Sequence, residues 1–226
     1  MEAEKIYERI QNAKLKANRN DKIFFTAVSK TRSVEEMKIA ENFSWIDYFG
    51  ENRVQEAEAK KFNSRLKWRL IGHLQSNKVR KAVEIFDYID SIDSVELALK
   101  IDRVAGEFNK VIPVLIEVNT SGEESKTGIN PKNFSQLLDT VIQQKNLRLE
   151  GLMTVGPITD DETKIRNSFA SLRELRDNAK NLTGLELPTL SMGMSDDFEL
   201  AILEGSTMIR IGTLLFGKRI YNPKIS

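Results

Sequence analysis

Lys30 is the residue in this sequence with the clearest chemical potential. It follows directly on an apolar run, residues 23–29. A lysine at the end of a buried strand loses hydration, which favours the neutral amine that attacks an aldehyde and forms an imine. The alternative is an ordinary lysine, whose stem packs on apolar surface while its ammonium reaches solvent or pairs with a carboxylate.

Two glycine-containing turns late in the chain suit a phosphate group. Residues 191–195 (Ser-Met-Gly-Met-Ser) lead into a helix expected from Asp196 with Ser195 as its N-cap, and Gly212-Thr213 closes the last expected strand. Backbone N–H groups and a helix N-terminus are common phosphate ligands, and glycine lets the main chain approach an anion closely. Asp196 and Asp197 place negative charge beside this site, and we expect them to point outward while they satisfy the helix dipole. Opposite Lys30, the two turns favour a phosphorylated aldehyde.

Arg210 is a candidate ligand for an aromatic nitrogen. It lies two residues before Gly212, on the same side of the same expected strand. A guanidinium that points into the mouth of a barrel can donate to a pyridine nitrogen, and its permanent charge keeps that nitrogen unprotonated. An ion pair with Glu117 or Asp90 is the competing prediction.

These residues need a scaffold that gathers several strand ends. A leading helix is expected from Ile6, Ile10, Ala13 and Ala17, which share one face. After it, short apolar runs alternate with amphipathic segments, and no linker divides the chain, so we expect one α/β domain over residues 1–226. The expected strands are 23–29, 46–50, 68–71, 88–92, 112–119, 149–155, 189–192 and 208–211. The expected helices are 34–41, 54–62, 76–85, 95–107, 133–144, 163–180 and 196–203.

This alternation is compatible with two parallel α/β folds. A (β/α)8 barrel typically takes about 250 residues, and the chain has 226. An open doubly wound sheet shows the same alternation of elements. We favour a single (β/α)8 TIM barrel with an extra N-terminal helix. In either fold, ligands bind beyond the carboxyl ends of the strands, where Lys30 and the two glycine turns lie.

The composition excludes several classes of site. The sequence has no cysteine and a single histidine, His73, so thiolate and multi-histidine metal sites and cysteine nucleophiles are excluded. Lys plus Arg number 34 and Asp plus Glu 33, and the net charge of +1 argues against binding to nucleic acid or an anionic membrane. No apolar run is long enough to span a bilayer and the N-terminus does not look like a signal peptide. We therefore expect a cytoplasmic protein without a metal.

Seven short segments carry a family resemblance. In chain order they are Ala-Val-Ser-Lys-Thr (27–31), Phe-Gly-Glu-Asn-Arg-Val-Gln-Glu (49–56), Ile-Gly-His-Leu-Gln-Ser-Asn-Lys (71–78), Ser-Lys-Thr-Gly (125–128), Gly-Leu-Met (151–153), Ser-Met-Gly-Met-Ser (191–195) and Arg-Ile-Gly-Thr (210–213). With them the chain resembles the pyridoxal phosphate homeostasis proteins, which are related in fold to the N-terminal barrel of alanine racemase. One position departs from the family: Arg69 stands where a histidine is usual, so no role carries over to that side chain.

The resemblance implies pyridoxal 5′-phosphate (PLP) as the cofactor. It implies that Lys30 holds PLP as an internal aldimine, which is a Schiff base. Five further positions match cofactor contacts of the family: Asn52 in the pocket lining, Ser195, Gly212 and Thr213 at the phosphate, and Arg210 at the pyridine nitrogen.

Two other polar residues have open roles. His73 can act as a general base near the cofactor, but a histidine beside a glycine at a strand end is more typical of a structural residue bonded to the backbone, which we favour. Lys126 lies in the loop Ser-Gly-Glu-Glu-Ser-Lys-Thr-Gly (121–128) and can contact or relay the cofactor. For Lys126 we favour a solvated loop lysine.

The functional alternatives are a carrier and an enzyme. The resemblance implies a protein that buffers PLP and delivers it transiently to apo-enzymes, without catalysis. A PLP-dependent amino-acid racemase needs acid and base groups on both faces of the substrate α-carbon. In alanine racemase a tyrosine from a second domain of the partner subunit supplies one of them, and we expect no such domain here; Tyr221 in the tail is the remaining candidate.

We therefore favour the carrier, as a monomer, and leave weak racemase activity open. A Schiff-base aldolase is a third hypothesis. It also uses a lysine on a barrel strand and a phosphorylated carbonyl substrate, but it requires a lysine that no cofactor retains.

Overall fold

Eight parallel strands close into a barrel in the computed structural model, which describes residues 2–123 and 125–217. The elements in chain order are α1 (Glu2–Lys16), β1 (Phe24–Val28), α2 (Val34–Glu41), β2 (Tyr48–Glu51), α3 (Val54–Lys60), β3 (Lys67–Leu70), η1 (Ser76–Lys78), α4 (Val79–Ile85), β4 (Tyr88–Ile92), α5 (Val95–Glu107), β5 (Ile112–Glu117), η2 (Pro131–Asn133), α6 (Phe134–Ile142), β6 (Leu147–Met153), α7 (Glu162–Thr183), β7 (Thr189–Ser191), α8 (Phe198–Leu203), β8 (Met208–Ile211) and α9 (Thr213–Phe216).

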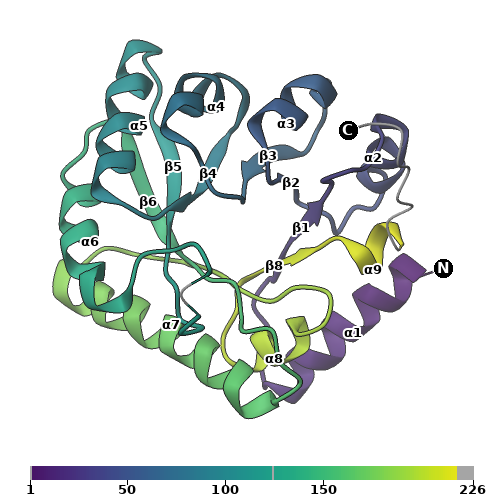
Figure 1. Ribbon diagram of the computed structural model, residues 1–226. Coiled ribbons are helices and arrows are strands. Elements are labelled where there is room, and N and C mark those ends of the chain that lie inside the picture. The colour runs from purple at the N-terminus through teal and green to yellow at the C-terminus, as the bar shows by residue number, and fades with distance from the viewer. Residues whose placement is uncertain (1, 124, 218–226) are drawn as a thin grey trace.

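The strands pair in chain order, and β8 returns to pair with β1. Figure 1 shows the helices around the strands, with α1 beside α8 and α9. The predicted (β/α)8 barrel with an extra N-terminal helix is confirmed, and the open-sheet alternative is wrong. None of the helices in the described part of the chain combines the length and the apolar character that a membrane span requires.

The predicted helix from Asp196 differs from the structure. Residues 194–197 form a turn of their own, in which the amide of Asp197 donates to the carbonyl of Met194. The helix α8 begins only at Phe198, and its N-cap is Asp197 rather than Ser195. The short helix α9 was not predicted, because four residues are too few for a periodic pattern.

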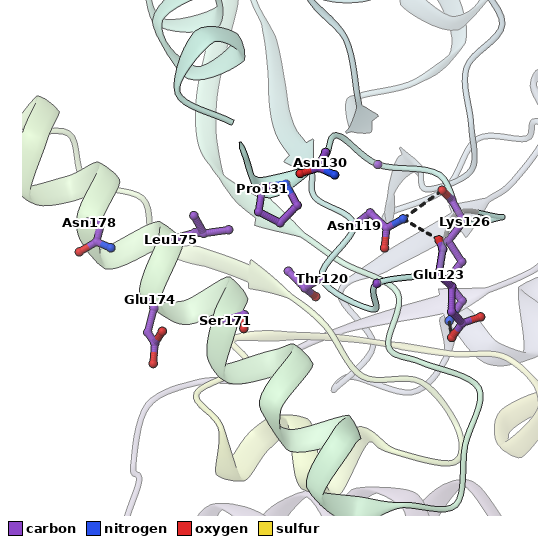
Figure 2. A pocket seen from close by; sticks show the side chains of 12 residues that line it. Asn119, Thr120, Glu123, Lys126, Asn130, Pro131, Ser171, Glu174, Leu175 and Asn178 are labelled. Carbon is purple, nitrogen blue, oxygen red and sulfur yellow. Dashed lines mark hydrogen bonds and ion pairs between the residues drawn. The ribbon is translucent and has the colours of Figure 1, made fainter. Parts of the chain in front are cut away.

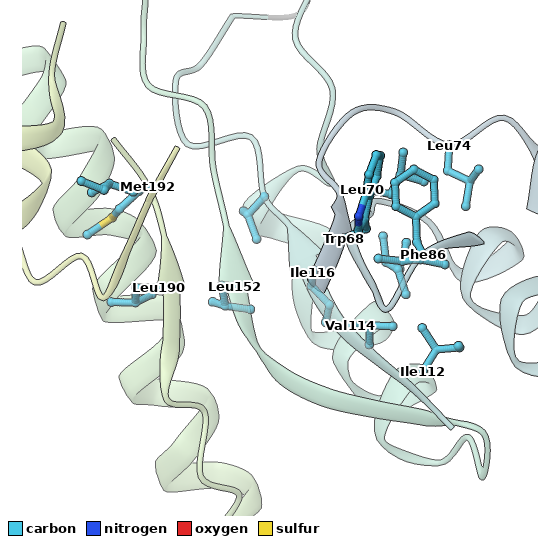
Figure 3. Packing of buried hydrophobic residues seen from close by; sticks show 14 of the residues in the cluster. Trp68, Leu70, Leu74, Phe86, Ile112, Val114, Ile116, Leu152, Leu190 and Met192 are labelled. Atoms are coloured by element: carbon cyan, nitrogen blue, oxygen red, sulfur yellow. The ribbon is translucent and has the colours of Figure 1, made fainter. Parts of the chain in front are cut away.

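Alternate strand residues build the layer between the barrel and its helices. Trp68 and Leu70 of β3 point outward into this layer, where they meet Phe86 from the end of α4 (Figure 3). Val114 and Ile116 of β5 also point into this layer, two strands further along the barrel. Because side chains alternate along a strand, the residues between these outward positions point into the barrel.

The barrel interior contains a charged pair. Arg69, between Trp68 and Leu70, is fully buried and holds Asp90 through two hydrogen bonds, of 2.7 Å from Nε and 2.9 Å from a terminal nitrogen. Its guanidinium carbon lies 4.0 Å from the ring centre of Tyr88. Burial opposes the charge, but the attraction of Asp90 outweighs it and raises the pKa of Arg69. Arg69 is thus a structural residue of the barrel interior, whatever the family has at this position.

Removal of one member of this pair should destabilise the fold. We expect Arg69→Met to lower the free energy of unfolding by about 3–5 kcal/mol, because it leaves Asp90 buried and uncompensated. The double variant Arg69→Met/Asp90→Val should recover most of this loss, and urea denaturation of both proteins measures the difference. If the free energy of unfolding falls equally in the two variants, the loss does not come from the uncompensated charge of Asp90.

Candidate functional site

A cavity of about 180 Å³ opens at the carboxyl ends of β1 and β8. Five of the six predicted site residues line it, and the sixth, Asn52, does not. The five are Lys30, Ser195, Arg210, Gly212 and Thr213. The closed barrel brings them together because β1 and β8 are neighbours in space although they stand at opposite ends of the sequence.

Lys30 occupies a tight turn after β1. The amide of Arg32 donates to the carbonyl of Ser29 at 3.0 Å and closes the turn around Lys30 and Thr31. Thr31 has a φ of +65°, which is unusual for a β-branched residue. The turn therefore holds a strained backbone immediately after the candidate lysine.

Arg32, which lines the cavity, ties this turn to the end of α9. Its guanidinium donates to the carbonyl of Phe216 at 3.1 Å and to the carbonyl of Gly217, both at the end of α9. It also pairs with Glu36 at 3.3 Å. Sequence reasoning missed this residue, since nothing in a local pattern shows that residue 32 reaches residue 216.

Arg210 is buried and held by the neighbouring strands. One terminal nitrogen donates to both the carbonyl and the hydroxyl of Ser191 at 2.7 Å, and the other donates to the carbonyl of Thr154 at 2.7 Å. The competing prediction of an ion pair with Glu117 or Asp90 is wrong, because Asp90 pairs with Arg69 and Glu117 bonds to the hydroxyl of Thr127. Burial lowers the pKa of Arg210, but arginine starts so high that the guanidinium stays charged.

One side of the cavity is formed by the two glycine turns. The hydroxyl of Ser195 accepts a hydrogen bond of 3.4 Å from the amide of Leu214 and so joins the two turns. A Cβ atom on Gly212 would lie 3.2 Å from the carbonyl oxygen of Val28, so a side chain there would press on β1 just before Lys30. Hydroxyl groups and a close main chain suit a phosphate.

The two aspartates beside these turns behave differently from each other. Asp196 is exposed at the rim of the cavity. Asp197 is buried, and its carboxylate accepts a 2.6 Å hydrogen bond from the amide of Met194. The prediction that both point outward is therefore wrong for Asp197, because the turn before α8 needs an acceptor for that amide.

Asn52 and His73 line a different cavity of about 780 Å³, between α3 and the segment after β3. The side-chain oxygen of Asn52 is buried and has no hydrogen-bond partner among residues 2–123 and 125–217. His73 is half exposed, and its Nδ1 lies 3.0 Å from a carboxylate oxygen of Asp93. We expected His73 to bond to a backbone group, but its partner in the structure is the carboxylate of Asp93.

Lys126 lies in a third cavity, of about 630 Å³, between α7 and the loop after β5 (Figure 2). Its ammonium donates to the carbonyl of Gly156 and pairs with Glu123 at 3.0 Å. Glu123 also accepts from the amide of Ile158 at 3.1 Å, so the two residues tie the β5–α6 loop to the β6–α7 loop. Only 13% of the Lys126 side chain is exposed, so the prediction of a solvated loop lysine is wrong.

Glu117 is a buried acid on the inner face of β5. One carboxylate oxygen accepts from the hydroxyl of Thr127 at 2.6 Å. The other is buried and lacks a partner within the described residues. Burial raises the pKa of Glu117, and the bond from Thr127 only partly opposes that.

Comparisons with known proteins identify the family of this chain. The sequence profile described as alanine racemase, N-terminal domain, matches residues 2–220. A protein of Aquifex aeolicus named pyridoxal phosphate homeostasis protein is 42% identical over 222 residues, which cover 96% of both chains. A protein of the same name from Pseudomonas aeruginosa is 39% identical over 226 residues, covering 98% of this chain and 96% of the relative. The chain belongs to the pyridoxal phosphate homeostasis family. The resemblance noted in the sequence is thereby confirmed.

Solved structures agree with this membership. PipY of Synechococcus elongatus, determined with PLP bound, has a TM-score of 0.81 and 37% identity, and the match covers 93% of this chain and 99% of PipY. Alanine racemase of Clostridium difficile has a TM-score of 0.75 at 18% identity, and the match covers 96% of this chain but 56% of the racemase. At that identity the racemase shows a shared fold. The named relatives of this family are called homeostasis proteins rather than enzymes.

The buried acid of β5 should make stability depend on pH. A carboxyl group whose pKa is raised by folding stabilises the fold below about pH 4.3, its ordinary pKa, and this contribution declines as the pH rises through the raised value. We expect Glu117→Gln, which keeps an acceptor for Thr127, to increase the free energy of unfolding at pH 8 by about 1 kcal/mol. The gain should shrink toward pH 4. Urea denaturation at several pH values tests this, and a gain that does not vary with pH would contradict it.

Proposed function

We propose that this chain binds PLP as a Schiff base on Lys30, buffers the cofactor and delivers it to apo-enzymes. The observation that carries the proposal is the single cavity that joins Lys30 to Arg210 and to the two glycine turns. The names of the relatives and the PLP bound to PipY support the same cofactor.

The chemistry of the cavity fits the parts of PLP one by one. PLP supplies an aldehyde that condenses with a primary amine, and Lys30 is the amine at the cavity. The hydroxyls of Ser195 and Thr213 and the main chain at Gly212 would hold the phosphate. Asn52, on the larger cavity beside α3, offers a buried oxygen that has no partner within residues 2–123 and 125–217, and it would extend the pocket lining.

Arg210 would face the pyridine nitrogen of the bound cofactor. Its bonds to Ser191 and Thr154 fix the guanidinium and leave it charged. A charged donor at this nitrogen keeps the ring unprotonated and lowers its capacity to accept electrons. Weak electron withdrawal suits a protein that stores PLP better than one that stabilises carbanions.

The tyrosines favour a carrier over a racemase. The ring of Tyr7 packs on Trp45, and the rings of Tyr48 and Tyr88 pack on Arg69 inside the barrel. None of these three lines the Lys30 cavity, and Tyr221 lies outside the described residues. We therefore assign no catalytic residue and no metal to this protein. We also propose that the protein is a cytoplasmic monomer. It would meet apo-enzymes transiently and bind neither nucleic acid nor membrane.

Loss of Lys30 should abolish the covalent link. We expect Lys30→Ala to give no reducible imine with PLP while its free energy of unfolding changes by no more than about 1 kcal/mol, as for other residues outside the core. Absorption spectra, borohydride reduction and peptide mapping measure the link, with Lys38→Ala on α2 as a control that should keep it. A pyridoxyl group that maps to another lysine in the wild type would refute the assignment.

Loss of the Thr213 hydroxyl should weaken cofactor retention. We expect Thr213→Ala to raise the dissociation constant for PLP about tenfold, because one hydrogen bond to a charged phosphate is lost. Thr140→Ala, whose hydroxyl bonds to the carbonyl of Gln136 on α6, is the matched control. Equal affinity of the Thr213 variant and the control would contradict the proposed phosphate site.

A further inference from the structure

The turn that carries Lys30 is held by charged residues of the next strand and helix. Ser29, on one side of Lys30, is fully buried. Its hydroxyl donates to a carboxylate oxygen of Glu51 at 2.7 Å, and its amide donates to the carbonyl of Gly50 at 3.0 Å. Glu51 is itself fully buried at the end of β2.

Lys60, at the end of α3, joins this carboxylate to the turn. Its ammonium lies 2.6 Å from Glu51, 2.8 Å from the carbonyl of Ser29 and 2.9 Å from Glu56. Three acceptors therefore surround a group that has three N–H donors. The carbonyl that Lys60 contacts is the same one that closes the turn by accepting from Arg32.

Glu56 holds the other side of Lys30. Its carboxylate accepts a hydrogen bond from the amide of Thr31, the residue with the φ of +65°. A strained conformation of this kind persists only where its surroundings fix it. The residues directly before and after Lys30 are thus bonded to one cluster of three charged side chains, which we name the clamp: Glu51, Glu56 and Lys60.

The clamp does not line the Lys30 cavity. Its bonds described above are to the two neighbours of Lys30: to the hydroxyl and the carbonyl of Ser29 and to the amide of Thr31. We propose that the clamp is a set of positioning residues, which fixes the turn so that the amine of Lys30 meets the aldehyde of the cofactor. This inference rests on the proposed function.

Imine formation depends on such placement. The nitrogen of Lys30 forms a C=N bond to the aldehyde carbon, and the aldehyde oxygen leaves as water with both amine protons. An error of about 1 Å in the placement of a reacting group can cost about a hundredfold in rate. A loosened turn therefore slows the covalent step while the phosphate side of the cavity stays intact.

Two variants loosen the clamp from different sides. The double variant Glu51→Gln/Lys60→Met removes the buried carboxylate and the ammonium that pairs with it, and the glutamine keeps an acceptor for the hydroxyl of Ser29. Glu56→Ala removes the acceptor for Thr31 and leaves the Glu51–Lys60 pair in place. Lys61→Met is the matched control, because Lys61 is the residue after Lys60 but donates to the carbonyl of Ile85, away from the turn.

Each variant is tested with two probes. The rate of imine formation with PLP is followed by absorbance and by borohydride trapping on Lys30. The affinity for pyridoxine 5′-phosphate, which carries an alcohol in place of the aldehyde, reports non-covalent binding alone. We expect both clamp variants to form the imine about tenfold more slowly or worse, with unchanged affinity for the alcohol. Lys61→Met should change neither quantity.

The outcomes separate the two proposals. A wild-type protein that forms no imine on Lys30 refutes the proposed function, and the positioning role with it. If the wild type forms the imine, then unchanged rates in Glu56→Ala overturn the clamp alone. Parallel losses of imine rate and alcohol affinity also overturn it, because they show general damage to the fold. If the double variant does not fold, Glu56→Ala decides the question, because Glu51 and Lys60 still pair with each other in that variant.

Discussion

The pairing of β8 with β1 closes the barrel, and the geometry of the candidate site depends on it. Thr26 lies beside Arg210 and Ala27 beside Ile211 in this pairing. Because both strands run in the same direction, their last residues emerge at the same end of the barrel. Lys30 and Thr213 therefore meet at one cavity, although 183 positions in the sequence separate them.

A closed barrel also creates an interior that must be filled, and here two buried arginines occupy part of it. Arg69 and Asp90 neutralise one another, while Arg210 is held by the carbonyls of Ser191 and Thr154. Buried charges of this kind are costly unless they are fully hydrogen-bonded. The interior therefore gives Arg210 a fixed orientation at the mouth of the barrel, where a ligand can contact it.

The turn after β1 is determined by its neighbours more than by its own residues. Ser29, Thr31 and Arg32 are bonded to groups on β2, α3 and α9, respectively. These contacts come from three elements that are distant from the turn in sequence. In the proposed carrier, these contacts would hold the amine of Lys30 in place before the cofactor arrives.

The sequence by itself determined the fold class and most of the candidate site. Hydrophobic periodicity predicted the observed bounds of α2, β4, α5 and β8. It could do so because the residues of a buried face recur with the period of the helix or strand. The position of Lys30 after an apolar strand and the two glycine turns were local features, so they could be recognised without coordinates.

Only the tertiary structure decided which partner each polar side chain takes. Ser195 proved to be bonded to Leu214 instead of capping α8, Asp197 is buried, and Lys126 ties two loops together. Asn52 lines a different cavity from the one that Lys30 lines. Hydrogen bonds and ion pairs depend on distances of a few ångströms between segments that are far apart in the chain. Hydrophobic periodicity shows only which face of each segment is buried. It therefore carries no information about those distances.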